Sequence, residues 1–345
     1  MKNFRVMTGL FFGVTFSFLL SGCEGASSTM LPVTTSGVVI SNLMWIVFGV
    51  AAVVFVVVET LLVISILKFR HKQKDPLQKA DLPEQVEGNQ FFETLWTMAP
   101  AIVLAIIFAL TVVALQTVIN PPQDGSTAIT NANMLNIRVT GHQWWWQFDY
   151  PNLKITTADE FHIPVNTVVM VSVQSADVIH SFWVPQFGGK IDVIPGHLNY
   201  TWFKATKTGV YNGQCSEYCG EEHAEMKFLV MVDTPEDYQT WVKSQQALPQ
   251  DVLGDAATGK QIVLTGVCSG CHTIRGTSAV GKIGPDLTHL ASRKIFSGGV
   301  LENTPDNLKK WLTDPSAVKP GTIMPKLSLS PDDITSLIAY LETLK

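Results

Sequence analysis

The 345-residue sequence predicts a membrane protein of several domains: a two-helix transmembrane hairpin, then an all-β domain, then an all-α domain. Two long apolar segments lie in the first third of the chain, and residues 133–233 alternate short apolar stretches with Gly, Pro and Asn. A Cys-x-x-Cys-His motif stands among helical patterns in the last hundred residues. A hydrophobic share of 46% and a mean hydropathy of +0.22 are high for a wholly soluble protein. The net charge of -5, with no face rich in Lys and Arg, gives no reason to expect a nucleic-acid partner.

Residues 1–22 have the composition of a secretory signal peptide. Lys2 and Arg5 precede an apolar run that ends in Leu20-Ser21-Gly22-Cys23, and this run is too short for a comfortable membrane span. The ending resembles a bacterial lipoprotein cleavage site, which implies that Cys23 becomes the lipidated first residue. The alternative is an uncleaved signal anchor with an incidental cysteine.

Residues 23–120 are predicted to form the transmembrane hairpin. The apolar runs 38–67 and 95–119 each exceed the ~20 residues that a helix needs to cross a bilayer. Five basic residues crowd the loop between them, whereas residues 24–37 contain none: Lys68, Arg70, Lys72, Lys74 and Lys79. The positive-inside rule places this loop in the cytoplasm. We therefore expect a multi-pass protein of the bacterial inner membrane, in contact with its lipid, with everything from residue 120 onward on the periplasmic, outer side.

One short loop collects ligands for a soft metal. Cys215, Cys219, His223 and Met226 lie within twelve residues, and His180 stands upstream at the end of an expected strand. Two Cys and two His would suit zinc. A thioether is instead typical of the weak axial position in copper sites, and two thiolates could bridge two copper ions. A disulfide between the cysteines, with His and Met nearby by chance, is the alternative.

The segment that contains this loop is predicted to be β structure. Expected strands are separated by turn residues and cover 135–139, 168–173, 198–203, 209–211 and 227–232. Several short strands of this kind predict a sandwich or a small barrel.

Four stretches of the chain resemble subunit II of cytochrome c oxidase and its dinuclear copper A site. They are the loop 213–220 with His223 and Met226, the Gly-His-Gln-Trp-Trp-Trp motif at 141–146, residues 177–185, and Ile-Pro-Gly at 194–196. The resemblance spans most of residues 38–233. It implies a cupredoxin-like barrel over residues 121–245.

The resemblance also implies roles for the ligands. Cys215 and Cys219 would bridge two copper ions, and His180 and His223 would each bind one. Met226 would be axial to one copper and the backbone carbonyl of Glu217 would serve the other. The Glu217 side chain would also help to bind a magnesium ion at the interface with subunit I.

Two further residues acquire expected roles from this resemblance. Trp144 corresponds to the position where an electron from a cytochrome arrives, although packing of the barrel is an alternative for any of Trp144, Trp145 and Trp146. Glu93, in Glu-Thr-Leu-Trp-Thr-Met-Ala-Pro, corresponds to a glutamate at the mouth of a proton pathway into subunit I. The alternative for Glu93 is an interfacial acid beside an aromatic anchor.

Residues 246–345 are predicted to be a second redox domain. After an expected helix at 234–245 and a linker at 246–250, Cys268 and Cys271 with His272 form the attachment signature of one covalent haem c. Met324 is the expected distal ligand. A helix at 256–265, Gly-Pro at 284–285 and a capped amphipathic helix after residue 330 resemble an all-α class I cytochrome c domain. A thioredoxin-like use of the cysteines would need a βαβ surround, and none is visible.

Together the domains resemble subunit II of a caa-type haem-copper oxidase of the aerobic respiratory chain. That implies electron transfer from a soluble or membrane-bound cytochrome c, or another external donor, through haem c to copper A. Electrons would continue to subunit I, which with other oxidase subunits is the expected partner, and where oxygen is reduced to water. The alternatives are a copper A subunit of a nitrous oxide or nitric oxide reductase, a quinol oxidase subunit II, and a membrane-anchored copper-binding lipoprotein.

Overall fold

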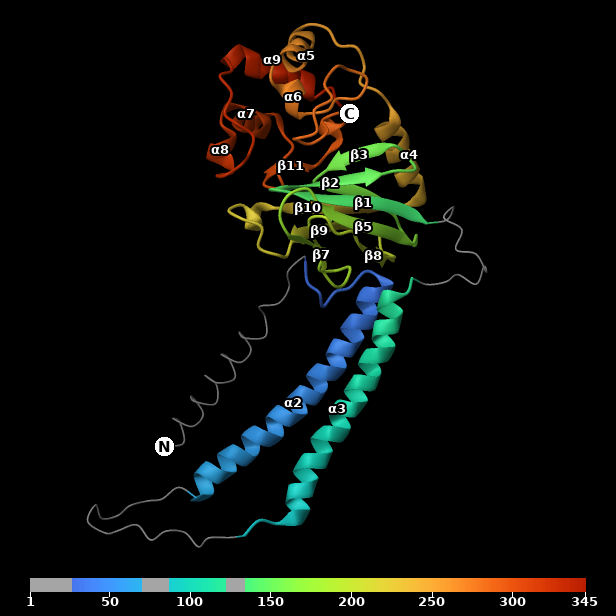
Figure 1. Ribbon diagram of the computed structural model, residues 1–345, viewed down its shortest axis with the longest axis vertical. Coiled ribbons are helices and arrows are strands. Elements are labelled where there is room, and N and C mark those ends of the chain that lie inside the picture. The colour runs from blue at the N-terminus through green and yellow to red at the C-terminus, as the bar shows by residue number, and fades with distance from the viewer. Residues whose placement is uncertain (1–26, 70–86, 122–133) are drawn as a thin grey trace, which may run out of the picture. The chain divides into compact units, whose positions relative to one another are not determined.

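The computed structural model describes residues 27–69, 87–121 and 134–345 (Figure 1). Contacts divide the chain into two compact units, residues 39–120 and the remainder, and each is described by itself. Cys23 and the basic residues between 70 and 79 lie outside the described residues, so the lipidation and loop-charge predictions are not tested by the structure.

The first unit consists of two long helices, α2 (Thr35–Phe69) and α3 (Gln90–Ile119). Both are long and apolar enough to cross a membrane, as the sequence predicted. Helix α3 starts five residues before the predicted Leu95 because Asn89 caps it: Asn89 Oδ1 accepts the N–H groups of Phe91 at 3.0 Å and Phe92 at 3.4 Å. Glu93 therefore lies in the first turn of this helix, where a carboxylate is favoured by the helix dipole.

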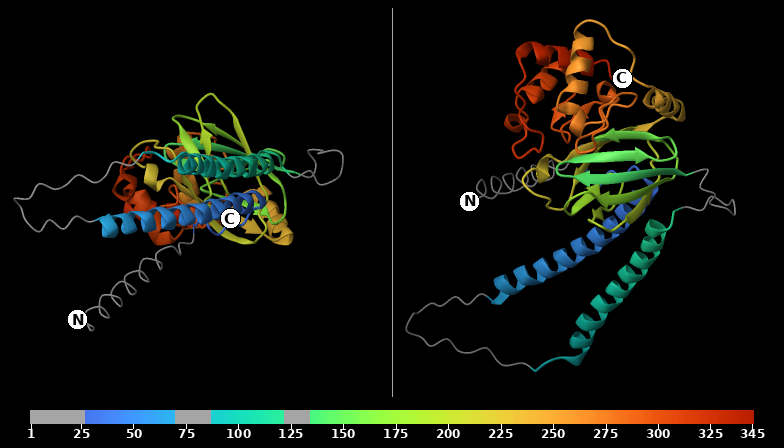
Figure 2. Two further views of the ribbon diagram at one scale, coloured as in Figure 1. Left: turned by 90° about the horizontal axis from the view of Figure 1, so that it is seen from below. Right: turned by 45° about the horizontal axis from the view of Figure 1, so that its top comes forward.

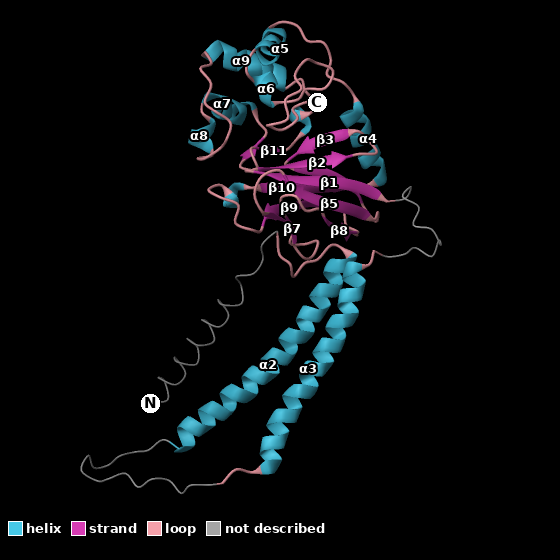
Figure 3. Ribbon diagram, in the orientation of Figure 1, coloured by secondary structure: helices cyan, strands magenta, loops and turns pink. Residues whose placement is uncertain are grey.

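The β domain of the second unit is a sandwich of two five-stranded sheets (Figures 2 and 3). The first sheet has the order β3-β2-β1-β5-β8, and its strands are β1 (Leu135–His142), β2 (Trp145–Tyr150), β3 (Ile155–Ala158), β5 (Val169–Ser175) and β8 (Asn199–Phe203). The second has the order β4-β10-β9-β6-β7, and its strands are β4 (Glu160–Pro164), β6 (His180–Trp183), β7 (Ile191–Val193), β9 (Gly209–Cys215) and β10 (Lys227–Asp233).

Large aromatic side chains fill the space between the two sheets. Phe148 and Trp146 of β2 alternate inward along the strand and are 0% exposed. Phe182 and Phe228 from the facing sheet stack with ring centroids 4.9 Å apart, and Phe148 stacks on Phe161 at 4.5 Å. Burial of such rings is a large share of the stability of a small sandwich. Packing of the barrel was the alternative for any of the three tryptophans, and it is the observed environment of Trp146.

The C-terminal domain is helical and has its own core. Helix α4 (Pro235–Gln246) follows β10 and packs on the β-domain core. The elements of the C-terminal domain are α5 (Asp255–Thr265), α6 (Cys268–Cys271), η2 (Leu290–Ser292), β11 (Ile295–Phe296), β12 (Leu301–Glu302), α7 (Pro305–Thr313), α8 (Pro315–Val318) and α9 (Pro331–Leu341). The predicted cap of α9 is present as a reciprocal capping box between Ser330 and Asp333. Leu337 and Tyr340 of α9 are at most 2% exposed and lie in a cluster separate from the β-domain core.

Candidate metal and haem sites

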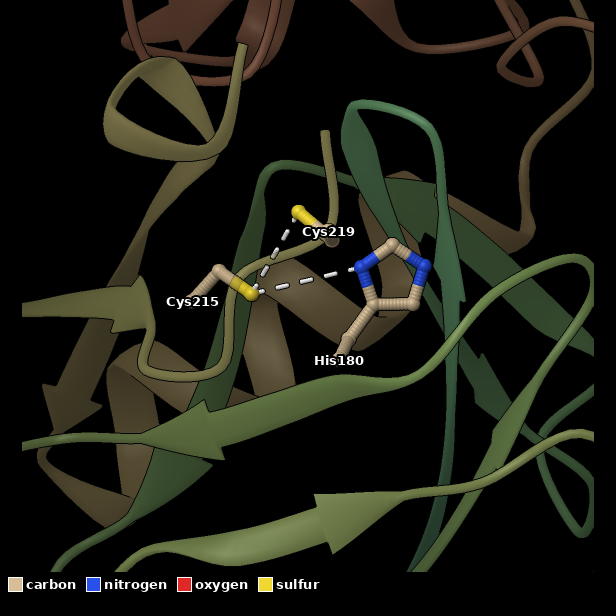
Figure 4. A group of neighbouring side chains, drawn as sticks. All are labelled: His180, Cys215 and Cys219. Atoms are coloured by element: carbon tan, nitrogen blue, oxygen red, sulfur yellow. Dashed lines mark hydrogen bonds between the residues drawn. The ribbon is translucent and has the colours of Figure 1, made fainter. Parts of the chain in front are cut away.

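The two cysteines of the soft-metal loop and His180 meet at one end of the sandwich (Figure 4). His180 begins β6, Cys215 ends β9, and Cys219 follows in the loop. Their ligand atoms lie within 4.8 Å of one another and all three residues are buried. Cys215 Sγ is 3.8 Å from Cys219 Sγ and 4.0 Å from His180 Nδ1. A disulfide would need about 2.05 Å between the sulfurs, and both cysteines are free.

The remaining predicted donors join the same cluster. Cys219 Sγ lies 3.6 Å from His223 Nδ1 and 3.8 Å from Met226 Sδ. The backbone carbonyl of Glu217 lies 3.2 Å from Cys215 Sγ. The short 3₁₀ turn η1 (His223–Glu225) returns the chain from Cys219 to β10 and so places His223 and Met226 beside the two thiols.

Asp177 is a residue of this site whose part the sequence analysis did not predict. Its Oδ1 lies 2.7 Å from His180 Nε2, and its Oδ2 accepts the backbone N–H of Gln143 at 2.6 Å. The carboxylate holds one ring nitrogen and leaves His180 Nδ1 facing Cys215. A carboxylate behind a ligating imidazole is the usual arrangement at metal sites. In the sequence, the acidic residue three positions before His180 could have indicated this contact.

Trp144 is tied to the same loop by its indole group. Trp144 Nε1 donates to the carbonyl of Cys219 at 3.1 Å, and the Gln143 side chain donates to that oxygen at 2.8 Å. A Cβ on Gly220, which has φ +120°, would lie 2.9 Å from the indole ring. The loop therefore closes on Trp144 only with glycine at this position.

The Cys-x-x-Cys-His motif lines a cavity of about 520 Å³. Cys268 and Cys271 are the first and last residues of α6, and His272 and Met324 line the same cavity. The volume is within the range of ~300–1,000 Å³ that is usual for cofactor sites. The structure thus brings all four predicted haem residues together.

The cavity extends to the β domain. Trp144 and Trp145 line it together with the haem residues. Trp144 therefore contacts both the soft-metal loop, residues 215–226, and the cavity of the predicted haem residues. They are called the copper loop and the haem cavity below, after the groups that they are predicted to hold.

Comparisons with known proteins cover each part of this architecture. Residues 26–115 match the family "Cytochrome C oxidase subunit II, transmembrane domain", residues 154–233 match "Cytochrome C oxidase subunit II, periplasmic domain", and residues 256–345 match "Cytochrome c". Cytochrome c oxidase subunit 2 of Alkalihalophilus pseudofirmus is 38% identical over 298 residues, which cover 86% of this chain and 84% of that protein. The chain belongs to the cytochrome c oxidase subunit II family.

Other subunit II proteins show the same similarity. Cytochrome c oxidase subunit 2 of Bacillus sp. strain PS3 is 34% identical over 76% of this chain and 77% of that protein. The crystal structure of the periplasmic domain of subunit II of cytochrome oxidase of Bradyrhizobium japonicum is 43% identical, covers 32% of this chain and 93% of that domain, and has a TM-score of 0.32. The three family matches and the observed elements confirm the predicted fold class. The curated relatives are subunits of a respiratory oxidoreductase, and a subunit II implies subunit I and other oxidase subunits as partners.

The subunit II fold implies copper A, and the buried thiol pair fits it. The hydrogen bond between the two thiols lowers the pKa of Cys215 against the opposing effect of burial, and the His180 ring and nearby backbone groups lower it further. The same pairing and burial raise the pKa of Cys219. Two thiolates 3.8 Å apart repel each other unless cations lie between them. Metal ions would supply that charge and deprotonate the second thiol.

The haem cavity also fits its implied group. The backbone carbonyl of Pro285 lies 2.8 Å from His272 Nδ1, so the other ring nitrogen is free for iron. Burial lowers the pKa of His272, which favours the neutral, ligating imidazole. The guanidinium of Arg293 lines the cavity at 7% exposure, and its Nε has no hydrogen-bond partner among the described residues. A buried cation suits the carboxylates of a haem.

The side chains of two other predicted residues are exposed to solvent. Glu93 is exposed near the start of α3. The Glu217 carboxylate lies 3.7 Å from Lys190 Nζ, with both side chains about half exposed. These positions leave their predicted roles, in proton uptake and magnesium binding, as proposals.

Proposed function

We propose that this chain is the electron-accepting subunit of a bacterial haem-copper cytochrome c oxidase of the caa type, in the inner membrane with its β and cytochrome domains on the periplasmic side. One observation carries the proposal. Cys268, Cys271, His272 and Met324 share a cavity with Trp144, whose indole donates to the carbonyl of Cys219. The Trp144 side chain therefore contacts both the cavity of the haem ligands and the loop of the copper ligands.

The chain would hold its groups with the residues already described. Cys268 and Cys271 would form the haem thioethers, and His272 and Met324 would bind its iron. His180, His223, Cys215, Cys219, Met226 and the Glu217 carbonyl would hold two copper ions. These groups would supply reversible one-electron chemistry between an external donor, such as cytochrome c, and subunit I, where oxygen is reduced to water.

The protein would contribute rigidity and exclusion of water at the copper loop. Met226 and His180 are 0% exposed, and Cys215 and Cys219 are each 4% exposed. Ligands held by strands and by Asp177 reorganise little when the charge of a site changes. Trp144 would provide the aromatic contact between the two sites.

Three smaller assignments accompany this proposal. Glu93 would receive protons for subunit I, the Glu217 side chain would help to bind magnesium at the subunit I interface, and Cys23 would carry the lipid. Replacement of Glu93 by Gln in the assembled oxidase should slow turnover and leave haem and copper contents unchanged.

Metal and haem analysis of the purified chain tests the proposal. We expect one covalent c-type haem and two copper ions, with the near-infrared band and mixed-valence spin signal of a copper pair. Cys219→Ser should remove that signal and keep the haem, whereas Met324→Ala should make the iron high-spin and keep the copper. Bound zinc, or a single copper, would contradict the proposal.

A further inference from the structure

A buried lysine of the cytochrome domain reaches into the β domain. Lys319 follows α8, is 3% exposed, and donates from Nζ to the carbonyl oxygens of Glu225 at 2.7 Å, Trp144 at 2.8 Å and Ser297 at 3.1 Å. An ammonium group has three N–H donors, so all three are used. Two of the acceptors belong to the β domain: one is the backbone of Trp144, and the other directly precedes the copper-ligand position Met226.

The turn that supplies the third carbonyl is also fixed to the β domain. Ser297, Gly298 and Gly299 have φ values of +60°, +68° and +77°. Gly298 N donates to Asp159 Oδ2 at 2.7 Å, and Gly298 O accepts the backbone N–H of Lys227 at 2.8 Å. This turn is called the docking turn below.

Gly298 leaves no room for a side chain at this contact. A Cβ there would lie 2.5 Å from Lys319 Nζ, 2.6 Å from the carbonyl oxygen of Trp144 and 2.7 Å from that of Glu225. The left-handed backbone conformation also favours glycine. The lysine and the docking turn therefore meet the β domain at one point, where a side chain larger than that of glycine would crowd both.

Asp159 supplies the buried opposite charge. It is 2% exposed, and its Oδ1 accepts the backbone N–H of Trp146 at 3.0 Å. Burial raises the pKa of Asp159, and the hydrogen bonds from Trp146 and Gly298 and the charge of Lys319 oppose that rise. Burial lowers the pKa of Lys319, and Asp159 opposes that fall. A buried charge that loses its partner is strongly unfavourable, so this contact resists separation.

A role inside the cytochrome fold alone does not account for Lys319. A lysine that served only that fold would need acceptors in its own domain, and Ser297 is the single one that it uses. The other acceptors place the ammonium beside the two chain segments that frame the copper loop and the haem cavity.

We propose that Lys319, together with the docking turn, is a positioning residue that locks the haem cavity against Trp144 and the copper loop. This inference rests on the proposed function for the identity of the two redox groups. The cytochrome domain is then a fixed donor and does not move freely on its linker. An external donor delivers its electron to the cytochrome domain, because the contact occupies the Trp144 side of the β domain.

The test uses the assembled oxidase with Lys319→Met, which keeps an unbranched side chain one atom shorter and removes the charge and the three N–H donors. Lys310→Met, on the exposed face of α7, is the matched control. Pulsed electron paramagnetic resonance would measure the distances between the haem iron and the copper pair, and hydrogen exchange would follow the backbone amides of Lys227 and Gly298. We expect a broadened distance distribution and exchange faster by about tenfold or more in Lys319→Met, and neither change in the control.

The outcomes separate the two proposals. If the wild-type oxidase lacks the haem or copper signals, the proposed function fails. If both signals are present and Lys319→Met keeps the narrow distribution and slow exchange of the wild type, the lock is wrong.

A second variant, in the docking turn, disturbs the same contact and is used if Lys319→Met does not assemble. Gly298→Ala should slow haem-to-copper transfer several-fold, because a Cβ at this position would push the docking turn away from the carbonyl oxygens of Trp144 and Glu225, and electron transfer slows as the distance between the redox groups grows. The kcat of the oxidase should fall while the KM for the external donor is unchanged. Gly189→Ala, where a Cβ meets nothing within 4 Å, is the control. An unchanged transfer rate in a correctly loaded Gly298→Ala oxidase would overturn the inference.

Discussion

At the scale of single residues, Asp177 shows how a group outside the ligand set shapes the metal site. Its carboxylate holds His180 Nε2 at 2.7 Å and the Gln143 amide at 2.6 Å, so it fixes the imidazole and the start of the Trp144 segment together. The contact with Gln143 is not visible from the ligand spacing, because Gln143 and Asp177 are 34 residues apart.

We predict that Asp177→Asn weakens copper binding by about 10- to 100-fold, the usual effect of losing a partner behind a ligating histidine. Competition with a copper chelator measures this directly. The matched control is Asp192→Asn, an exposed aspartate on β7. Equal copper affinities for wild type and Asp177→Asn would refute the role given to this carboxylate.

His162 gives the β domain a pH-dependent contribution to stability. Burial by itself lowers its pKa, but the hydrogen bond to Asp233 at 2.6 Å and the ion pair with Glu160 at 3.7 Å outweigh burial and raise it. A raised folded-state pKa means that the protonated imidazole is favoured in the folded protein. The stabilisation is complete below the unfolded value of about 6.5 and is lost as pH rises through the folded value.

His162→Gln should therefore lower the free energy of unfolding by about 1–3 kcal/mol at pH 5.5, and by less at pH 9. Urea unfolding followed by tryptophan fluorescence at both pH values measures the difference. His197→Gln, at an exposed position, should show no such pH dependence. A loss that is equal at the two pH values would exclude the charged pair as its cause.

At the scale of elements, the contact of α5 with α9 depends on one glycine. A Cβ on Gly259 would collide with the backbone carbonyl of Ser336 and lie 2.8 Å from Tyr340 Cβ. In an exposed helix, Gly→Ala would stabilise by about 1 kcal/mol. Here overpacking, at about 1–3 kcal/mol, should be the larger effect.

Gly259→Ala should thus lower the melting temperature of the cytochrome domain, measured from the loss of the haem absorption band on heating. Thr258→Ala, at the exposed position beside it, gains helix propensity without a new contact and should not lower it. A higher melting temperature in Gly259→Ala would show that α5 and α9 can move apart to accept the methyl group, and that overpacking is not the larger effect.

The sequence predicted those elements whose evidence is local. The apolar runs gave α2 and α3, the capping residues gave α4 and α9, and the β-branched stretch gave β5. Short strands such as β3 and β7 were missed because three or four residues carry too little alternation. The donors of the copper loop could be predicted since they lie close together in the sequence, and the structure brings them together; their roles stay proposals.

Long-range pairs were beyond sequence patterns. Lys319 lies 175 residues from Trp144, and Gly298 lies 139 residues from Asp159. Nothing in the local spacing of these residues indicates the contact. The predicted linker at 246–250 is likewise held in place, because Arg275 Nη2 donates to the carbonyl oxygens of Gln245 and Ala247.

At the scale of the whole molecule, the β domain and the cytochrome domain have separate cores but share buried charges. Trp146, Phe148 and Phe228 belong to one cluster, and Leu337 and Tyr340 to the other. Separate cores let each domain keep its structure when the other is perturbed. Two hydrogen bonds nevertheless join the domains: the Gly298 amide donates to Asp159, and the Lys294 amide donates to Glu160 at 2.7 Å. Unfolding of one domain should therefore destabilise the other by the loss of these hydrogen bonds.

This arrangement predicts the result of removing the haem attachment. In Cys268→Ser/Cys271→Ser the cytochrome domain should lose its haem, while the β domain should still bind two copper ions, because every copper donor comes from the β domain. The free energy of unfolding of the β domain should nevertheless fall by about 1–3 kcal/mol. Without haem the cytochrome domain is less ordered, so the buried oxygens of Asp159 and Glu160 would lose the amides of Gly298 and Lys294. Copper analysis and urea unfolding measure the two quantities. Loss of copper together with haem would show that the domains fold as one unit, and an unchanged unfolding free energy would show that the shared charges contribute nothing.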